Sequence, residues 1–572
     1  MVGPARGAAG TARTGGGPGK AGPPPVAPSG QPDDGGDQAG TGPRRAAPNR
    51  ERARQRRWAW PAGFLVAGVL LFAGYIRLSA TYPVNSDGAN IVLMAWDMVH
   101  GNLLLHAWSM SDVAFYTTEL PQYMLLDAIR GLSPDVTHIA AAMTYTLALV
   151  LAALLARGRA RGGEGLSRVL VAGGIMLAPQ LGVGIFVLLL SVGHIGTAVP
   201  VLLVWLLLDL APPRWYVPVI AGVLLVWADI ADSLVLVVAI VPLAFVCAVR
   251  VARRLAAREP LRAAWYELSL AAAAVIAIPV AAVAGRVIHA IGGYTLHTVP
   301  FSFVTVAKWP AHLRVTAHGV LALFGANFTG LGTGAAVFFA ILHLAGLFLV
   351  LSAVCLVAWR FLRPAALIDQ VLAVAIVVNL AVYVPSTLAS GVLNAREFAV
   401  VLPFGAALAG RVFGPRLRGT RLSPVLLAVL AGYVACLGYE LAQPTVPPAN
   451  ARLASWLQAH HLDHGLSGYW QASSVTLDSG GQVTIRAVVN HGPGLVPYQW
   501  ESKSTWFDPA SQQANFVVLQ NQPGFFNYWM PVSEVHTVFG QPAATYRTGP
   551  YTVLVWHRNL LASLRTWQQR AS

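Results

Sequence analysis

The chain has 572 residues, of which 55% are hydrophobic and only 11% are charged. Soluble domains carry about 25% charged residues, so this composition excludes a soluble protein and indicates an integral membrane protein. The net charge of +15 would suggest nucleic acid in a soluble domain. Here the basic residues lie in short segments between apolar runs, where they set membrane orientation, so no nucleic-acid partner is expected.

The first 57 residues are rich in Gly, Pro and Ala and end in an arginine cluster between Arg44 and Arg57. This composition cannot bury a core and predicts a disordered, basic, cytoplasmic segment over 1–57. The first membrane helix is expected from about Trp58 to Ile76. Because positive residues stay in the cytoplasm, the loop over 81–133 is expected outside the cell.

The next apolar runs alternate with arginine-rich segments such as 157–168 and 250–262. Further membrane helices are expected over about 136–156, 169–190, 195–211, 216–230, 233–249, 268–288, 335–359, 366–384, 398–413 and 425–441. The pattern predicts a transmembrane domain over 58–445 with about eleven helices. The cytoplasmic N-terminus and extracytoplasmic C-terminus follow from the arginines, and a multi-pass protein of the plasma membrane is expected.

The C-terminal residues 446–572 change in character. Residues 451–460 have the pattern of an amphipathic helix, and 482–489, 515–519 and 551–556 have that of strands. The expected fold is therefore an α-helical polytopic membrane protein with a small extracytoplasmic α/β domain. The three cysteines, Cys247, Cys355 and Cys436, fall in apolar segments without metal-ligand spacing, which argues against disulfides and a zinc site.

Acidic residues gather in the first outer loop. Asp87 lies between Pro83 and Gly88, in a turn that can project a carboxylate towards the membrane surface, where it can act as a base. The alternative is an Asx turn or an N-cap of the helix that follows. Asp97 lies about 15 Å further along that helix, so Asp112 and Glu119 are the better partners. A merely solvated loop is the simpler explanation of them all.

Polar residues also interrupt two helix pairs on the same side of the membrane. His194 lies in the break over 191–197, and Asp229 and Asp232 lie in the break over 228–233. Charged groups at a membrane boundary are costly, which makes these residues candidates for substrate binding. The alternative is that they only cap helices and form turns.

Arg396 lies at the outer end of the predicted tenth helix, whereas most arginines near helix ends lie inside. An outward arginine suits a lipid phosphate or pyrophosphate, which it can bind with two parallel hydrogen bonds. The alternative is an ion pair with Glu397 or with an acid of the first loop. Lys308 and Arg314, in a segment expected on the outer membrane surface, are candidates for the same role.

Motifs of soluble nucleotide-dependent enzymes are missing. The sequence contains no P-loop, no Gly-x-Gly-x-x-Gly after a strand, no His-Glu-x-x-His and no Cys-x-x-Cys. Chemistry that depends on ATP or NAD is therefore not expected, and the sequence assigns no cofactor with certainty, although a divalent metal is left open.

The loop acids, the many helices, the outward arginine and the C-terminal domain together resemble the GT-C glycosyltransferases. These polytopic enzymes include protein mannosyltransferases, arabinosyltransferases and aminoarabinose transferases, and the resemblance covers 58–572 as architecture. Asp87 matches the acid of the family's first outer loop. Arg396 precedes Leu402 and Pro403, which is similar to the family's Arg-Tyr near Leu-Pro, with Phe398 and a longer gap. Gly88 replaces the second acid of the usual pair.

The resemblance implies sugar transfer from a polyprenyl-phosphate donor to a hydroxyl of a cell-envelope glycan, lipid or protein. Asp87 would take the hydroxyl proton, Asp112 or Glu119 would assist, and Arg396 would stabilise the departing phosphate. The Ala-, Gly- and Pro-rich composition is similar to that of actinobacterial proteins. A transporter or flippase of lipid-linked saccharides is the alternative, and a membrane scaffold that presents the C-terminal domain is a third.

Overall fold

The computed structural model describes residues 48–190, 193–297, 299, 301–417, 420–491, 494–522 and 530–564. The chain divides into two units, Met1–Pro61 and Ala62–Ser572. In the first unit the described residues, 48–61, all belong to helix α1 (Pro48–Ser79). This helix includes 48–57, for which the sequence predicts disorder, because Arg, Ala, Glu and Gln are good helix formers and Pro48 stands at the first position, where proline is tolerated.

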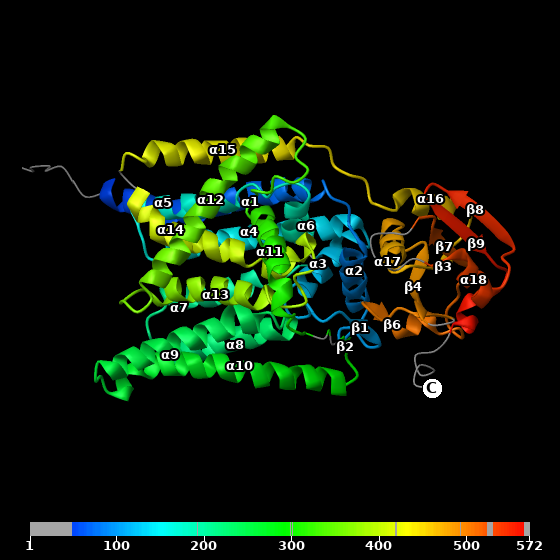
Figure 1. Ribbon diagram of the computed structural model, residues 1–572, viewed down its shortest axis with the longest axis horizontal. Helices are drawn as coiled ribbons and strands as arrows, with labels where there is room; N and C mark the ends of the chain where they lie inside the picture. Colours follow the sequence, from blue (N-terminus) through cyan, green and yellow to red (C-terminus); the bar gives the residue numbers. More distant parts are fainter. Residues whose placement is uncertain are drawn as a thin grey trace, which may run out of the picture. The chain divides into compact units, whose positions relative to one another are not determined.

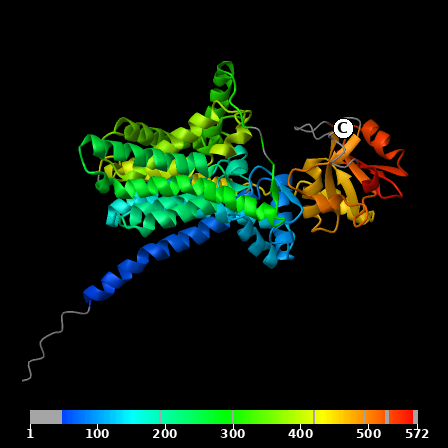
Figure 2. The same cartoon turned by 90° about the horizontal axis from the view of Figure 1, so that it is seen from below.

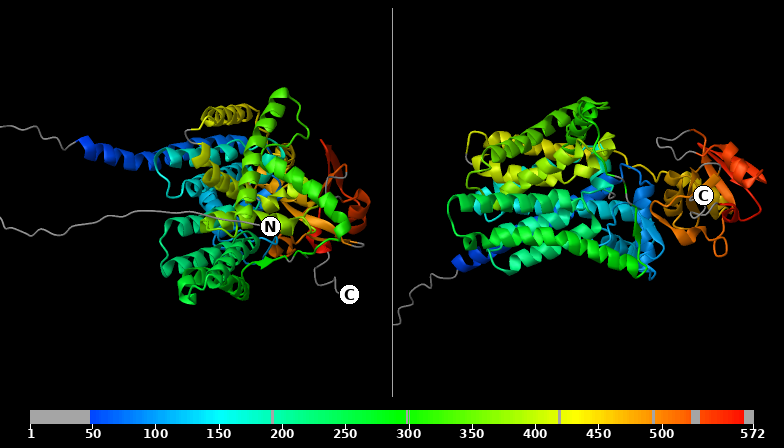
Figure 3. Two further views of the ribbon diagram at one scale, coloured as in Figure 1. Left: turned by 60° about the vertical axis from the view of Figure 1, so that its left-hand side comes forward. Right: turned by 60° about the horizontal axis from the view of Figure 1, so that its bottom comes forward.

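The second unit is mostly helical, and its long helices pack along their lengths (Figures 1 to 3). Before the C-terminal region its helices are α2 (Ser86–Val99), α3 (Leu120–Arg130), α4 (Pro134–Arg157), α5 (Gly162–Met176), α6 (Val183–Leu189), α7 (Ala198–Leu210), α8 (Tyr216–Ala231), η1 (Leu236–Ile240), α9 (Val241–Ala256), η2 (Leu261–Ala264), α10 (Trp265–Ala290), η3 (Val306–Lys308), α11 (Trp309–Leu323), α12 (Gly334–Trp359), α13 (Leu367–Tyr383), η4 (Val392–Phe398), α14 (Val401–Leu417) and α15 (Ser423–Leu441).

Within the described ranges, six helices are long and apolar enough to cross a membrane, and a seventh span results if η4 and α14, bent by 58°, count as one. Three more apolar helices, α7, α8 and α13, are shorter. The prediction of about eleven spans is thus not confirmed. The helix predicted over 169–190 is divided into α5 and α6, since Pro179 and Gly182, whose φ is 76°, interrupt it.

The arginine-rich loops lie together at one end of the helices. Arg159 donates to the carbonyl of Ala211, and Arg250 donates to that of Ala365. Arg411 of α14 forms buried ion pairs with Asp209 and Asp369, at 3.0 and 2.5 Å. These contacts join the ends of α4, α7, α9, α13 and α14, as the predicted alternation of arginine-rich and arginine-poor loops requires. The side of the membrane on which this end lies remains a prediction.

The C-terminal region, residues 446–564, contains a six-stranded sheet in the order β5-β4-β3-β7-β9-β8. The strands of the second unit are β1 (Trp108–Met110), β2 (Thr295–Leu296), β3 (His464–Ser467), β4 (Thr484–His491), β5 (Gly494–Pro497), β6 (Ser502–Lys503), β7 (Phe516–Gln520), β8 (Ala544–Thr548) and β9 (Tyr551–Val555). The remaining helices are α16 (Ala451–Ala459), α17 (Tyr469–Asp478), η5 (Ser504–Phe507), α18 (Val532–Phe539) and η6 (Leu560–Ser563). The predicted amphipathic helix and all three predicted strands are confirmed, with shifts of a few residues.

Successive side chains of β7 pack alternately into the hydrophobic cores on the two faces of this sheet. Phe516 and Val518 pack with α16 and α17, whereas Val517 and Leu519 pack with α18, because successive strand residues point to opposite faces. In Figure 1 these helices lie on the two sides of the strands. β3 is parallel to β4 and β7, and the outer pairs are antiparallel.

The C-terminal region packs directly on the first loop. Strand β1 pairs with β6 of the C-terminal region and with β2, which forms a small three-stranded sheet (Figure 1). Asp97 of α2 forms an ion pair of 2.9 Å with Lys503. The Ser86 hydroxyl at the start of α2 donates to the carbonyl of Tyr469 at the start of α17, at 2.6 Å. The first turns of α2 and α17 are therefore held against each other.

Candidate functional site

Asp87 lies in the first turn of α2 with its carboxylate free of a capping role. Asn85 is the N-cap, and its side chain accepts a hydrogen bond from the N–H of Gly88 at 3.0 Å. The alternative that Asp87 caps this helix is therefore wrong. A Cβ at Gly88 would lie 3.1 Å from Val84 and 3.3 Å from Thr137 of α4, so the absence of a side chain lets this turn approach α4 closely.

Arg396, on η4 just before its bend to α14, lies beside Asp87. Its Nη1 lies 3.7 Å from Asp87 Oδ2, and its Nε lies 3.6 Å from Glu397 Oε1. Both distances exceed the length of a hydrogen bond, and a third of the side chain is exposed. The guanidinium thus has donors left for an anion. Both alternatives named for Arg396, a pair with Glu397 and a pair with a loop acid, occur together.

The ring of His194 lies between the carboxylates of Asp232 and Glu397, the second of which also contacts Arg396. Its Nε2 lies 2.8 Å from Glu397, and its Nδ1 lies 2.7 Å from Asp232. Because both ring nitrogens face carboxylates, both must carry a proton, so the ring is an imidazolium. Burial opposes this charge, but the negative charges of Asp232 and Glu397 raise the pKa of His194 well above its usual value.

Asp232, just after α8, is charged and well satisfied. It accepts hydrogen bonds from His194, from the hydroxyl of Thr197 and, at 2.9 Å, from the N–H of Leu234. Burial alone would raise its pKa, but the positive charge and hydrogen bonds of His194 keep that pKa below the usual value. The end of α8 is thereby fixed to the segment that carries His194.

Glu119 is buried beside this arrangement. The hydroxyl of Thr118 donates to its Oε2, whereas Oε1 has no hydrogen-bond partner among the described residues. A Cβ at Gly196 would collide with Oε1 of Glu119, so any larger residue there would force the Glu119 side chain to move. Burial, and then the charge of Asp232, raise the pKa of Glu119 to about 7. Glu119 therefore exchanges its proton near neutral pH.

The segment between Asp112 and Glu119 is anchored on the end of α8. The carbonyl of Ala231 accepts the N–H groups of Ala114 and Phe115, both at 3.0 Å, and the Thr117 hydroxyl donates to Trp227 at 2.6 Å. Burial, and then the charge of Glu397, raise the pKa of Asp112. Asp112 is thus electrostatically coupled to the same group of residues.

We name as the polar cluster the residues Asp87, Asp112, Glu119, His194, Asp232, Arg396 and Glu397. They come from the first loop, the break before α7, the end of α8 and η4. The structure thus brings together Asp87, Asp112 and Glu119 of the first loop with His194, Asp232 and Arg396, all of which the sequence indicates. It adds Glu397, which sequence reasoning treats only as a competing partner of Arg396.

Two further members of the site come from the C-terminal region. The Tyr469 hydroxyl donates to Asp87 Oδ1 at 2.6 Å and lies 2.8 Å from Glu501 Oε2. Asn90 donates to the same oxygen of Glu501 at 3.1 Å. All four side chains belong to buried residues. Sequence reasoning misses Tyr469 and Glu501, since neither stands in a motif and only the docking of the C-terminal region places them here.

The other predicted site residues lie apart from these contacts. Lys308 and Arg314 are exposed on η3 and α11, and within the described ranges their side chains form no hydrogen bond or ion pair. Asp229 is half-buried in the last turn of α8, three residues before Asp232. The carboxylate of Asp97 accepts hydrogen bonds of 2.6 to 2.9 Å from Lys503, Trp108 and Asn102. In the predicted break over 191–197, residues 191 and 192 lie outside the described residues.

A metal site is not evident in this arrangement. Within the part of the chain that the structure describes, no three His, Cys, Asp or Glu side chains are grouped so that they could hold a metal ion. The acids of the polar cluster are instead spaced by Arg396 and His194. The divalent metal that the sequence leaves open therefore has no assigned ligands.

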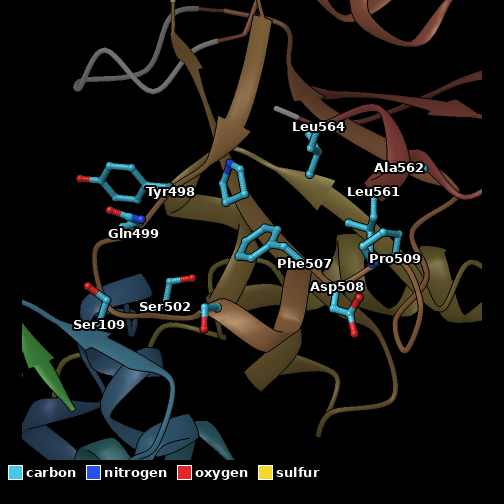
Figure 4. Close-up of a pocket in the computed structure, with 12 residues that line it drawn as sticks. Ser109, Tyr498, Gln499, Ser502, Phe507, Asp508, Pro509, Leu561, Ala562 and Leu564 are labelled. Atoms are coloured by element: carbon cyan, nitrogen blue, oxygen red, sulfur yellow. The ribbon is translucent and has the colours of Figure 1, made fainter. Parts of the chain in front are cut away.

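A cavity of about 390 Å³ lies where the first loop meets the C-terminal region. Figure 4 shows Phe507 at its centre, with Tyr498 and Gln499 on one side and Pro509 and Leu561 on the other. The ring of Tyr498 lies 5.2 Å from that of Tyr469. Tyr498 therefore lines the cavity and also contacts the residue that binds Asp87.

No protein-family model matches this sequence, and no curated protein matches it. Two solved structures of the Archaeoglobus fulgidus oligosaccharyltransferase are similar, one in the apo form and one tethered by a disulfide bond to an acceptor peptide containing the NVT sequon. Each has 14% identity and a TM-score of 0.44, and the match covers 81% of this chain and 69% or 70% of that chain. We assign no residue role and no activity from a likeness at this level.

Proposed function

We propose that the protein is a membrane glycosyltransferase that moves a sugar from a polyprenyl-phosphate donor to an acceptor hydroxyl on the extracytoplasmic side. One observation carries the proposal. The carboxylate of Asp87 and the guanidinium of Arg396 lie 3.7 Å apart, where the first loop meets η4. A base and a phosphate-binding cation side by side are what this transfer needs.

The reaction follows from the two groups. The oxygen of the acceptor hydroxyl bonds to the anomeric carbon of the donor sugar, while Asp87 accepts the proton of that hydroxyl. The bond between that carbon and the phosphate oxygen breaks, and the polyprenyl phosphate leaves with the electron pair. Arg396 binds the phosphate oxygens and stabilises the charge that develops on them. Its contacts with Asp87 and Glu397 are longer than hydrogen bonds, so the donor phosphate can compete with these two carboxylates for the guanidinium.

The rest of the polar cluster positions Arg396. Glu397, the next residue, is bound to His194, which is bound to Asp232 at the end of α8. This row of charge-assisted contacts fixes η4 against the rest of the site. Asp112 and Glu119 flank the anchored segment, and we propose them as partners of the acceptor. Asp229, Lys308 and Arg314 remain proposals for donor binding, and among the described residues no hydrogen bond or ion pair joins their side chains to Arg396.

The test is sugar transfer in membranes that contain the full chain. The probes are polyprenyl phosphates that carry radiolabelled mannose, glucose or arabinose, and the readout is label transferred to envelope material. Asp87→Asn is expected to lower the rate at least about 100-fold, because general-base catalysis contributes that much or more. Asp463→Asn, at an exposed acid of the C-terminal region, is the matched control.

Transfer at the wild-type rate by correctly folded Asp87→Asn would show that Asp87 is not the base. A flippase, the alternative function, would move the labelled donor from one leaflet of a vesicle membrane to the other without releasing its sugar. The same labelled probes, enclosed in vesicles, separate the two activities.

A further inference from the structure

The hydroxyl of Tyr469 lies between two carboxyl groups. Its distances to Asp87 Oδ1 and Glu501 Oε2 are 2.6 and 2.8 Å, and both carboxyl groups belong to buried residues. A tyrosine hydroxyl has one proton to donate. If both carboxyls were ionised, one of these short oxygen pairs would contain no proton and would be repulsive. The geometry therefore requires one proton more, on Asp87 or on Glu501.

The surroundings of the two carboxyls decide which one holds that proton. Asp87 faces the guanidinium of Arg396 and lies in the first turn of α2, where the helix dipole favours a negative charge. Among the residues that the structure describes, the partners of Glu501 are Tyr469 and the neutral amide of Asn90, which donates to it. The extra proton thus belongs to Glu501, which then donates to the Tyr469 oxygen, while Tyr469 donates to Asp87.

We propose that Glu501, protonated at neutral pH, and Tyr469 form a hydrogen-bonded relay in which the C-terminal region positions Asp87. The relay fixes Oδ1 and leaves Oδ2 towards Arg396. Tyr469 and Glu501 act through Asp87 and are positioning residues. The proposal rests on the proposed function for its activity readout, whereas the position of the proton can be measured without any activity.

Few charged groups surround the relay. Besides Tyr469 and the neutral amide of Asn90, the groups that act on Glu501 are the charged side chains of Asp87 from α2 and Arg396 from η4. Next along the chain, Lys503 is engaged by Asp97, and Trp500 stacks on the ring of His297. Burial, and then the charge of Asp87, raise the pKa of Glu501 to about 8. Above this pH the relay loses its extra proton.

The variants that test the relay separate hydrogen bonding from charge. Glu501→Gln cannot ionise, and its amide nitrogen can donate to Tyr469 in place of the acid O–H, although that nitrogen no longer accepts the hydrogen bond of Asn90. Tyr469→Phe and Glu501→Ala each break the relay. Asp478→Asn is the matched control, because Asp478 also lies in α17 and binds the N–H of Asn450 rather than Asp87.

Transfer by the wild type is expected to fall about tenfold as the pH rises from 7 to 9, as Glu501 ionises. Glu501→Gln is expected to lose this alkaline fall and to transfer within about threefold of the wild type at pH 7. Tyr469→Phe and Glu501→Ala are expected to lose at least tenfold in kcat at pH 7, and Asp478→Asn is expected to keep the wild-type pH profile. Identical profiles for the wild type and Glu501→Gln would overturn the proposal.

A second readout needs no activity. An acid with a raised folded pKa adds stability that is full below its unfolded pKa, about 4.3, and is lost as the pH rises through the folded value. The Tm of the wild-type chain in nanodiscs is therefore expected to fall between pH 5 and 8 relative to Glu501→Gln, with no further relative change above 8. An infrared difference spectrum of the two proteins at pH 7 should contain the carbonyl band of a protonated carboxylic acid.

These measurements keep the two proposals apart. If the wild type transfers no sugar but the infrared band and the Tm difference are present, the glycosyltransferase proposal fails and the relay stands. If transfer depends on Asp87 but the band and the Tm difference are missing, the relay fails and the proposed function stands.

Discussion

Replacement of His194 by alanine should destabilise the protein strongly because it leaves two buried carboxylates without their cation. The imidazolium of His194 lies 2.7 Å from Asp232 and 2.8 Å from Glu397, and the three side chains are only 10, 3 and 17% exposed. Removing one partner of a buried ion pair costs about 3–5 kcal/mol. We expect a loss of this size for His194→Ala in the free energy of unfolding.

The physical cause can be separated from mere loss of packing. If unpaired charge is responsible, the triple variant His194→Ala with Asp232→Asn and Glu397→Gln should recover roughly half of the loss, since neutral amides are far cheaper to bury than carboxylates. Steric-trapping measurements in bicelles at pH 7 give the free energies. A triple variant no more stable than His194→Ala would refute this reasoning.

The pH dependence of this interaction has a definite sign. The folded pKa of His194 is raised well above its usual value, so the stability that it contributes is full below the unfolded pKa, about 6.5. That stability is lost as the pH rises through the folded value. The difference in unfolding free energy between the wild type and His194→Ala should therefore start to shrink above about pH 6.5 and continue to shrink until the pH has passed the raised folded pKa.

Three further changes probe the site. Gly196→Ala should lower the free energy of unfolding by about 1–3 kcal/mol, because its Cβ would collide with Oε1 of the buried Glu119. Gly193→Ala should cost less, because its Cβ would meet its nearest atoms at 3.4 Å. Equal Tm values for the two variants would contradict this. Glu119→Gln should remove a titration near pH 7 from the rate profile. It should also remove the loss of stability that the wild type undergoes between about pH 4.3 and 7. An unchanged rate profile would contradict the raised pKa of Glu119. Arg396→Lys should slow transfer at least about tenfold, because lysine cannot bind phosphate bidentately, and wild-type kinetics would exclude phosphate binding there.

Local patterns in the sequence were sufficient for the elements and for several site residues. Apolar runs located the long helices, and alternation located the strands of the C-terminal region, because burial of one face imposes a period on a single segment. Asp87, His194, Asp232 and Arg396 could be selected because a charged or polar group is conspicuous in so apolar a chain. The division of the helix over 169–190 was missed, although Pro179 and Gly182 mark it, since its hydrophobicity continues across the break.

Contacts between distant segments were decided only by the tertiary structure. The sequence could offer Asp87 as a base or as an N-cap, and only the observed hydrogen bond of Asn85 removes the second role. Nothing near Tyr469 or Glu501 indicates their meeting with Asp87, because their positions depend on the docking of the C-terminal region through β1, β6 and the pair of Asp97 with Lys503. Hydrophobic periodicity records which face of a segment is buried, but not which segment covers it. The composition therefore determined the membrane class and the candidate acids, and the fold alone determined which of these acids face a counter-ion.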